Sequence, residues 1–184
     1  MKFAKQLIAL AAVAAAFSAH AESDITTGAG ALTATARLDF RVIVPKVLFL
    51  QVGTGTAFTD VATIDRVDFT LLAADVTSGL PIAGVSTGGA INARVLGNGG
   101  NVTFGSTGTA GGLTNGAQTI PWTQIAPTVV GALIHPTVDA AAATLTPVAG
   151  VVNQTAVYSF NYSNTSVVAA GTYNGRVTYT ASVL

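Results

Sequence analysis

Residues 171–184 read GTYNGRVTYTASVL, and this stretch decides the fold class. Its apolar positions are Val177, Tyr179, Ala181 and Val183, and a polar residue stands between each pair. A period of two places one set on the buried face of a β-sheet and the other toward water. We therefore expect a strand that runs from Gly171 to the last residue and whose edge is open to another strand.

A second alternating segment lies near the other end of the chain. Its apolar residues occupy every second position and alternate mostly with Thr, Arg and Asp. They are Leu32, Ala34, Ala36, Leu38, Phe40, Val42 and Val44. The pattern is longer than a usual strand of about 5–6 residues. Pro45 interrupts it and residues 47–52 resume it, which indicates an edge position, a bulge or a change of sheet.

The rest of the chain predicts further strands separated by glycine and asparagine turns. We expect a strand at 67–72, a hairpin of 91–96 with 101–104 around the turn 97–100, and a weak hairpin within 113–120. Residues 155–162 place Ala156, Tyr158, Phe160 and Tyr162 on one core face. The alanine run at 140–143 is the only helical signal after the first 21 residues, and flanking prolines confine it to about two turns. The expected class is all-β, with a sandwich architecture.

The first 21 residues have the features of a secretory signal peptide. Lys2 and Lys5 form a positive start, residues 7–17 are apolar, and Ala19-His20-Ala21 is a small-residue cleavage site. We expect the mature chain to begin at Glu22 and to leave the cell through the periplasm. The apolar run is shorter than the about 20 residues that a membrane helix needs, so we expect no span in the mature chain.

Composition limits the classes of partner. Removal of residues 1–21 leaves 163 of the 184 residues, with six basic and eight acidic side chains and no cysteine. The formal charge of −2 argues against nucleic acid as a partner. Only 9% of the whole chain is charged, against about 25% in typical soluble domains. This favours either a subunit that buries much of its surface in an assembly or a domain covered with Thr, Ser and Asn.

Few residues could carry catalysis. Gly84-Val85-Ser86-Thr87-Gly88 matches the G-x-S-x-G of a nucleophile elbow, but that motif needs a strand before it and a helix after it. The mature chain has one histidine, His135, which we expect at the surface or at the rim of the core. The motif is interpreted as a glycine-rich loop, and we predict no enzyme activity, no catalytic residues and no cofactor.

Other candidate sites are equally sparse. Asp60, Asp65 and Asp68 cluster loosely but lack the spacing of a known calcium loop, so we predict no metal site. Trp122 is a single aromatic residue that either supports a sugar or packs at the edge of the core.

The two ends of the chain resemble those of chaperone–usher pilus subunits. In that family the last strand alternates apolar residues and a glycine lies fourteen residues from the end, where Gly171 lies here. The family also has an alternating N-terminal extension after the signal peptide, a role that Leu32, Ala34, Ala36 and Leu38 fit. Val183 stands where the family usually has tyrosine, and the family's common disulfide is impossible without cysteine.

The resemblance implies an incomplete immunoglobulin-like β-sandwich, completed by a strand that a neighbouring copy donates. The implied organisation is a signal peptide at 1–21, a donor extension at 22–38 and a pilin-like domain at 39–184. The donor strand comprises Leu32, Ala34, Ala36 and Leu38, and the receiving edge comprises Gly171, Val177, Tyr179, Ala181 and Val183. The implied function is a structural subunit of a cell-surface pilus that supports adhesion or biofilm. Its partners would be further copies of itself, a periplasmic chaperone and an outer-membrane usher.

Two other functions stay open. One is a monomeric secreted module that binds polysaccharide or a host surface, in which the N-terminal strand pairs within its own sandwich. The other is a small hydrolase, which needs a base beside Ser86, and His135 is the only histidine available to it.

Overall fold

A computed structural model describes residues 22–55, 58 and 64–183, and the predicted signal peptide lies outside this range. The chain divides into two units, one up to Val44 and one from Pro45 onward. In the described part of the first unit every residue is exposed and no strand is assigned. All named strands belong to the second unit. They are β1 (Leu48–Gly53), β2 (Val67–Asp68), β3 (Ile82–Ala83), β4 (Val85–Ser86), β5 (Ile91–Gly97), β6 (Val102–Gly108), β7 (Leu113–Thr114), β8 (Thr119–Ile120), β9 (Ile125–Gly131), β10 (Ala143–Leu145), β11 (Val152–Tyr162) and β12 (Val177–Val183).

The second unit is all-β and antiparallel, as the sequence predicts. The largest sheet has the order β1-β5-β11-β3, and β9 pairs with the opposite edge of β11. A second sheet has the order β10-β6-β12. Two-stranded pairs, β2 with β4 and β7 with β8, complete the set. Within the described residues, the only helical turn is the 3-10 turn Trp122–Gln124, and there is no helix long and apolar enough to cross a membrane.

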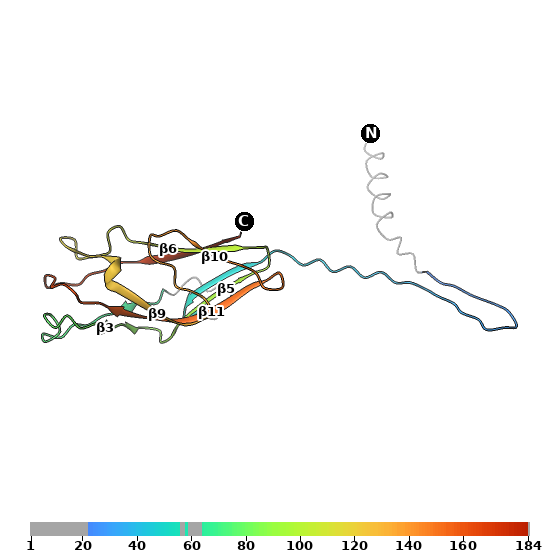
Figure 1. The fold of residues 1–184 in the computed structure, drawn as a ribbon, viewed down its shortest axis with the longest axis horizontal. Coiled ribbons are helices and arrows are strands. Elements are labelled where there is room, and N and C mark those ends of the chain that lie inside the picture. The colour runs from blue at the N-terminus through green and yellow to red at the C-terminus, as the bar shows by residue number, and fades with distance from the viewer. Residues whose placement is uncertain (1–21, 56–57, 59–63, 184) are drawn as a thin grey trace, which may run out of the picture. The chain divides into compact units, whose positions relative to one another are not determined.

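The two larger sheets share one hydrophobic core. In β5, Ile91, Ala93 and Val95 are buried, and β6 buries Val102 and Phe104 in the same cluster. Figure 1 shows β6 and β10 in one layer and β5, β9 and β11 in the other. Alternation with a period of two therefore brings the inward sets of both sheets against each other.

β11 is the central strand of the larger sheet. Its residues Ala156, Tyr158 and Tyr162 are buried and Phe160 packs against the same core, as the sequence predicts. The Tyr158 hydroxyl donates a hydrogen bond to the Ile134 carbonyl at 2.8 Å, which satisfies the polar end of a buried ring. Burial raises the pKa of Tyr158 to about 12.

The predicted hairpin around residues 97–100 is wrong. β5 pairs with β1 and β11, whereas β6 pairs with β10 and β12, so this turn carries the chain from one sheet to the other. Both strands have an apolar face, and crossing between layers lets the two faces meet in the core. The weaker prediction around Asn115-Gly116 is confirmed, because β7 and β8 form a hairpin there.

Two other local predictions are corrected. The alanine run 140–143 forms no helix; Asp139 has a positive φ of 60°, and Ala143 begins β10. The strand expected at 67–72 is limited to β2, which is two residues long.

Candidate strand-pairing site

The C-terminal strand is shorter than the sequence predicts. β12 begins at Val177, six residues after Gly171, which lies in the preceding loop beside the Asn115 side chain. Leu184 lies outside the described residues. Along β12 the residues alternate between half-buried and exposed, and the half-buried set is the predicted one. The half-buried residues are Val177, Tyr179, Ala181 and Val183.

One edge of β12 is paired and the other is free in the described part of the chain. β12 pairs only with β6, and the Thr109 N–H donates to the Arg176 carbonyl at 2.8 Å. In an antiparallel pair, every second residue of a strand bonds to its neighbour. Because Arg176 bonds to Thr109, directly after the end of β6, the residues at the same parity, Thr178, Thr180 and Ser182, also bond to β6. The four half-buried residues of β12 therefore direct their backbone N–H and C=O groups to the free edge. None of them is proline, so every N–H on this edge is available as a donor.

A second free edge lies close by. β1 and β12 contact each other without forming a ladder, and β1 is the terminal strand of the larger sheet. Leu50 and Val52 of β1 and Tyr179 and Ala181 of β12 pack on the core without full burial. β1 and β12 thus each have an unpaired backbone edge, and each also has apolar side chains that are only partly covered.

His135 supports this edge from inside. Its Nε2 and the Tyr179 hydroxyl are 2.7 Å apart, and its ring lies 5.0–5.5 Å from those of Tyr158, Phe160 and Tyr179. Its Nδ1 is buried without a hydrogen-bond partner in the described residues. Burial lowers the pKa of His135, mainly through loss of water around the charged form, and it raises the pKa of Tyr179. His135 is half-buried and packs among the rings of Tyr158, Phe160 and Tyr179, at the rim of the core.

Trp122 anchors the start of β12. Its Nε1 donates to the Thr109 carbonyl at 3.0 Å, and its ring lies over Gly108 and Gly175. A Cβ at Gly175 would come within 2.9 Å of the ring, so the close approach requires glycine. The half-buried ring matches the interpretation of Trp122 as a residue at the edge of the core.

The extension carries the other candidate residues. Leu38, Phe40 and Val42 are 74%, 86% and 84% exposed, and Leu32 is 50% exposed. Ala34 and Ala36 are exposed as well. The apolar alternation predicted for a donor strand is therefore presented to solvent in the described chain, and it continues beyond Leu38 to Val44.

Residues 22–26 run back alongside residues 33–37. Glu22 and Arg37 form a bidentate ion pair with both contacts at 2.7 Å, which lowers the pKa of Glu22 and raises that of Arg37. The Thr35 N–H donates to Asp24 Oδ2 at 3.2 Å. The Thr26 hydroxyl donates to the Thr33 carbonyl at 3.0 Å, and the chain bends at residues 29–30.

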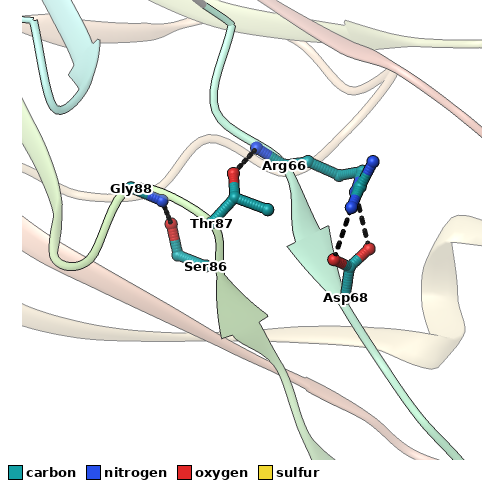
Figure 2. Close-up of polar contacts among 5 residues, drawn as sticks. All are labelled: Arg66, Asp68, Ser86, Thr87 and Gly88. Carbon is teal, nitrogen blue, oxygen red and sulfur yellow. Dashed lines mark hydrogen bonds and ion pairs between the residues drawn. The ribbon is translucent and has the colours of Figure 1, made fainter.

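The G-x-S-x-G match lies in a different environment from a nucleophile elbow. Figure 2 shows Ser86 in β4, where its Oγ accepts a long 3.4 Å hydrogen bond from the Gly88 N–H, and Arg66 paired with Asp68. A turn follows Ser86 and no helix does. His135, the base considered from the sequence, has its hydrogen bond with Tyr179.

The aspartates that were considered for calcium binding have other partners. Asp65 accepts hydrogen bonds from the Thr54 N–H at 2.6 Å and from the Thr54 hydroxyl at 3.0 Å, and Asp68 pairs with Arg66. Asp60 lies outside the described residues. Within the described chain no three acidic or histidine side chains gather as a metal site would require.

A cavity of about 670 Å³ lies where the loop before β12 meets the end of β11. Phe69, Tyr162 and Tyr173 line it, together with small and polar residues. The Tyr162 hydroxyl is buried and has no partner among the described residues, and burial raises its pKa.

Comparison of the chain with protein-family models, curated proteins and solved structures found no match. Sequence reasoning missed the contact between His135 and Tyr179, since 44 residues separate them and no local signal connects them.

Proposed function

We propose that this chain is the structural subunit of an extracellular pilus-like filament and that it polymerises by strand donation. The observation that carries the proposal is the free edge of β12, whose alternate residues are only half-buried and lie beside the free edge of β1. In this proposal the second unit is an incomplete immunoglobulin-like sandwich, and the missing strand comes from a second copy.

The extension has the properties that such an insert needs. Its apolar side chains recur at every second residue and are exposed, so each can enter a groove bordered by β12. Burial of each large apolar side chain favours binding by about 1.5–3 kcal/mol, while ordering of the backbone costs about 1–2 kcal/mol per residue. Backbone hydrogen bonds to the free edge of β12 are therefore needed as well as pockets.

Head-to-tail donation gives an open fibre. The donating segment and the receiving edge are different surfaces of one chain, so their contact is heterologous and need not close into a ring. The signal peptide predicted at 1–21 fits this function, because the subunit must reach the periplasm before it assembles at the cell surface. A periplasmic chaperone and an outer-membrane usher are the proposed assembly partners, since an unfilled edge would otherwise pair at random.

A matched pair of variants tests the proposal. Leu38→Asp places a charge on the apolar side of the extension and should abolish filaments, because an unpaired charge would enter an apolar groove. Ile43→Asp makes the same change of charge at an odd-numbered residue beyond the donor strand, with the same 74% exposure, and should leave assembly intact. Filaments are scored by negative-stain electron microscopy and sedimentation. Equal behaviour of the two variants would contradict strand donation through the apolar side.

The aromatic-lined cavity favours one alternative, a monomeric secreted module that binds polysaccharide or a host surface. Phe69, Tyr162 and Tyr173 could contact the apolar faces of a sugar. This alternative predicts a wild-type protein whose size in solution does not change with concentration, and the filament proposal predicts growing polymers under the same conditions.

A further inference from the structure

The contacts inside the extension keep one register. Glu22 meets Arg37, Asp24 meets Thr35 and Thr26 meets Thr33, so each step of two residues on one side matches a step of two on the other. This is the spacing of two antiparallel segments on either side of the bend at residues 29–30, and residues 22–26 make all three contacts through their side chains. We call residues 22–26 the arm.

The arm engages one edge of the following segment. In an extended strand, the N–H and C=O groups of alternate residues point to opposite edges. The Thr33 carbonyl and the Thr35 N–H both bond to the arm, so the backbone groups of the odd-numbered residues face it. The backbone groups of the even-numbered residues, which carry the apolar side chains, face the other edge.

The free edge of β12 requires those same groups. On β12, the residues whose side chains turn to the core also direct their backbone groups to the free edge. Residues directly opposite each other in an antiparallel pair share a face, so a strand that buries Ala34 and Ala36 beside β12 must bond through the even-numbered residues. The arm leaves these groups available.

We propose that the extension is donated as a two-stranded hairpin, in which one edge of residues 32–38 pairs with β12 of a second copy and the arm covers the other edge. This inference rests on the proposed function. The arm puts the carboxylates of Glu22 and Asp24 beside the outer edge of the inserted strand. Charges on an edge discourage addition of a further strand, so the arm would end the sheet after the insert.

Hydrogen exchange of the assembled full-length mature chain tests this inference residue by residue. In wild-type filaments, the amides of Ala34 and Ala36 should be protected by β12 and the amide of Thr35 by Asp24. Asp24→Ala should accelerate exchange at Thr35 by about tenfold or more and leave Ala34 and Ala36 protected. Arg37→Ala should act in the same direction and Arg37→Lys should restore part of the protection. Arg41→Ala, a cation of the same extension on the same odd-numbered side, should leave exchange at Thr35 unchanged.

The outcomes separate the inference from the proposed function. If Ala34 and Ala36 are protected while Thr35 exchanges freely in wild-type filaments, a single strand is donated and the hairpin inference is wrong. The inference is also overturned if Asp24→Ala and Arg37→Ala leave exchange at Thr35 unchanged. If Ala34 and Ala36 exchange freely in filaments, or if no filaments form, donation of this strand fails and the proposed function falls with it.

Discussion

His135 is the residue whose protonation would most directly disturb the inner face of β12. The imidazole lies among three aromatic rings, its Nε2 pairs with the Tyr179 hydroxyl, and its Nδ1 has no partner in the described structure. A protonated ring would carry two N–H donors and a charge in this environment. Burial therefore favours the neutral form and lowers the pKa of His135.

We expect the folded protein to lose stability as the pH falls below 6.5, the ordinary pKa of histidine. Because the folded pKa is lowered, the unfolded chain binds a proton that the folded chain does not, so the contribution is complete above 6.5 and declines in acid. Denaturant unfolding at a series of pH values measures it. His135→Phe should remove the decline just below 6.5; an identical slope in that variant would assign the effect to other groups.

Ser86 gives a second prediction for a single residue. Ser86→Ala removes only a long hydrogen bond from Gly88, so unfolding free energy should change by no more than about 0.5 kcal/mol and assembly should continue. The matched change Gly84→Ala should destabilise by about 1–3 kcal/mol, because the new methyl group overlaps Val67 and Phe69. Hydrolytic activity that disappears in Ser86→Ala would favour an enzyme over the structural function.

At the scale of elements, the two edges of β12 have separable roles. Ala181 directs its N–H to the free edge, whereas Thr180 bonds to Gly105 of β6 in the ladder. A proline removes the N–H at either position. The same substitution at adjacent residues therefore tests the outer and the inner edge separately.

Ala181→Pro should leave the isolated subunit folded and should block polymerisation. Thr180→Pro should lower the unfolding free energy by about 1–3 kcal/mol, because the Gly105 carbonyl loses its donor. Circular dichroism during denaturation measures the stability, and sedimentation measures assembly. Normal filaments from Ala181→Pro would show that the free edge of β12 receives no strand.

The strands that the sequence predicts best are those with an internal period of two. The core face of β11 is confirmed at Tyr158 and Tyr162 because the pattern depends only on burial of alternate residues. The sequence wrongly predicts a hairpin at residues 97–100. A turn signal identifies a change of chain direction but not the sheet that the next strand joins. β12 starts later than the alternation predicts, and the residue before Arg176, Gly175, packs under Trp122, a contact between distant segments that the local pattern does not contain.

At the scale of the whole molecule, the predicted signal peptide and the arm make one joint prediction. Cleavage after Ala21 would leave Glu22, the partner of Arg37, as the first residue. N-terminal sequencing of protein recovered from the cell surface should read Glu-Ser-Asp-Ile. Retention of Lys2 or Lys5 would contradict both the export route and a free donor end.

The outer edges of β9 and β10 are less suited to pairing than that of β12. The hydrogen bonds from Ser163 to Gln124 and from Ala132 to Thr155 set the register of β9, and they direct residue 127 to the outer edge. That residue is Pro127, which has no N–H to offer. β10, at the far side of the smaller sheet, is only three residues long.

In the proposed filament, Pro127 would limit the number of neighbours that each copy can bind. With the outer edge of β9 interrupted, and with the free edges of β1 and β12 lying side by side as parts of one receiving site, each copy that assembles by strand donation has one donating end and one receiving site. Such a unit links to two neighbours at most, so growth yields an unbranched chain with two chemically different tips. One tip keeps an empty receiving edge and the other keeps an unused extension, and either tip could be closed by a terminating subunit that lacks one of the two parts.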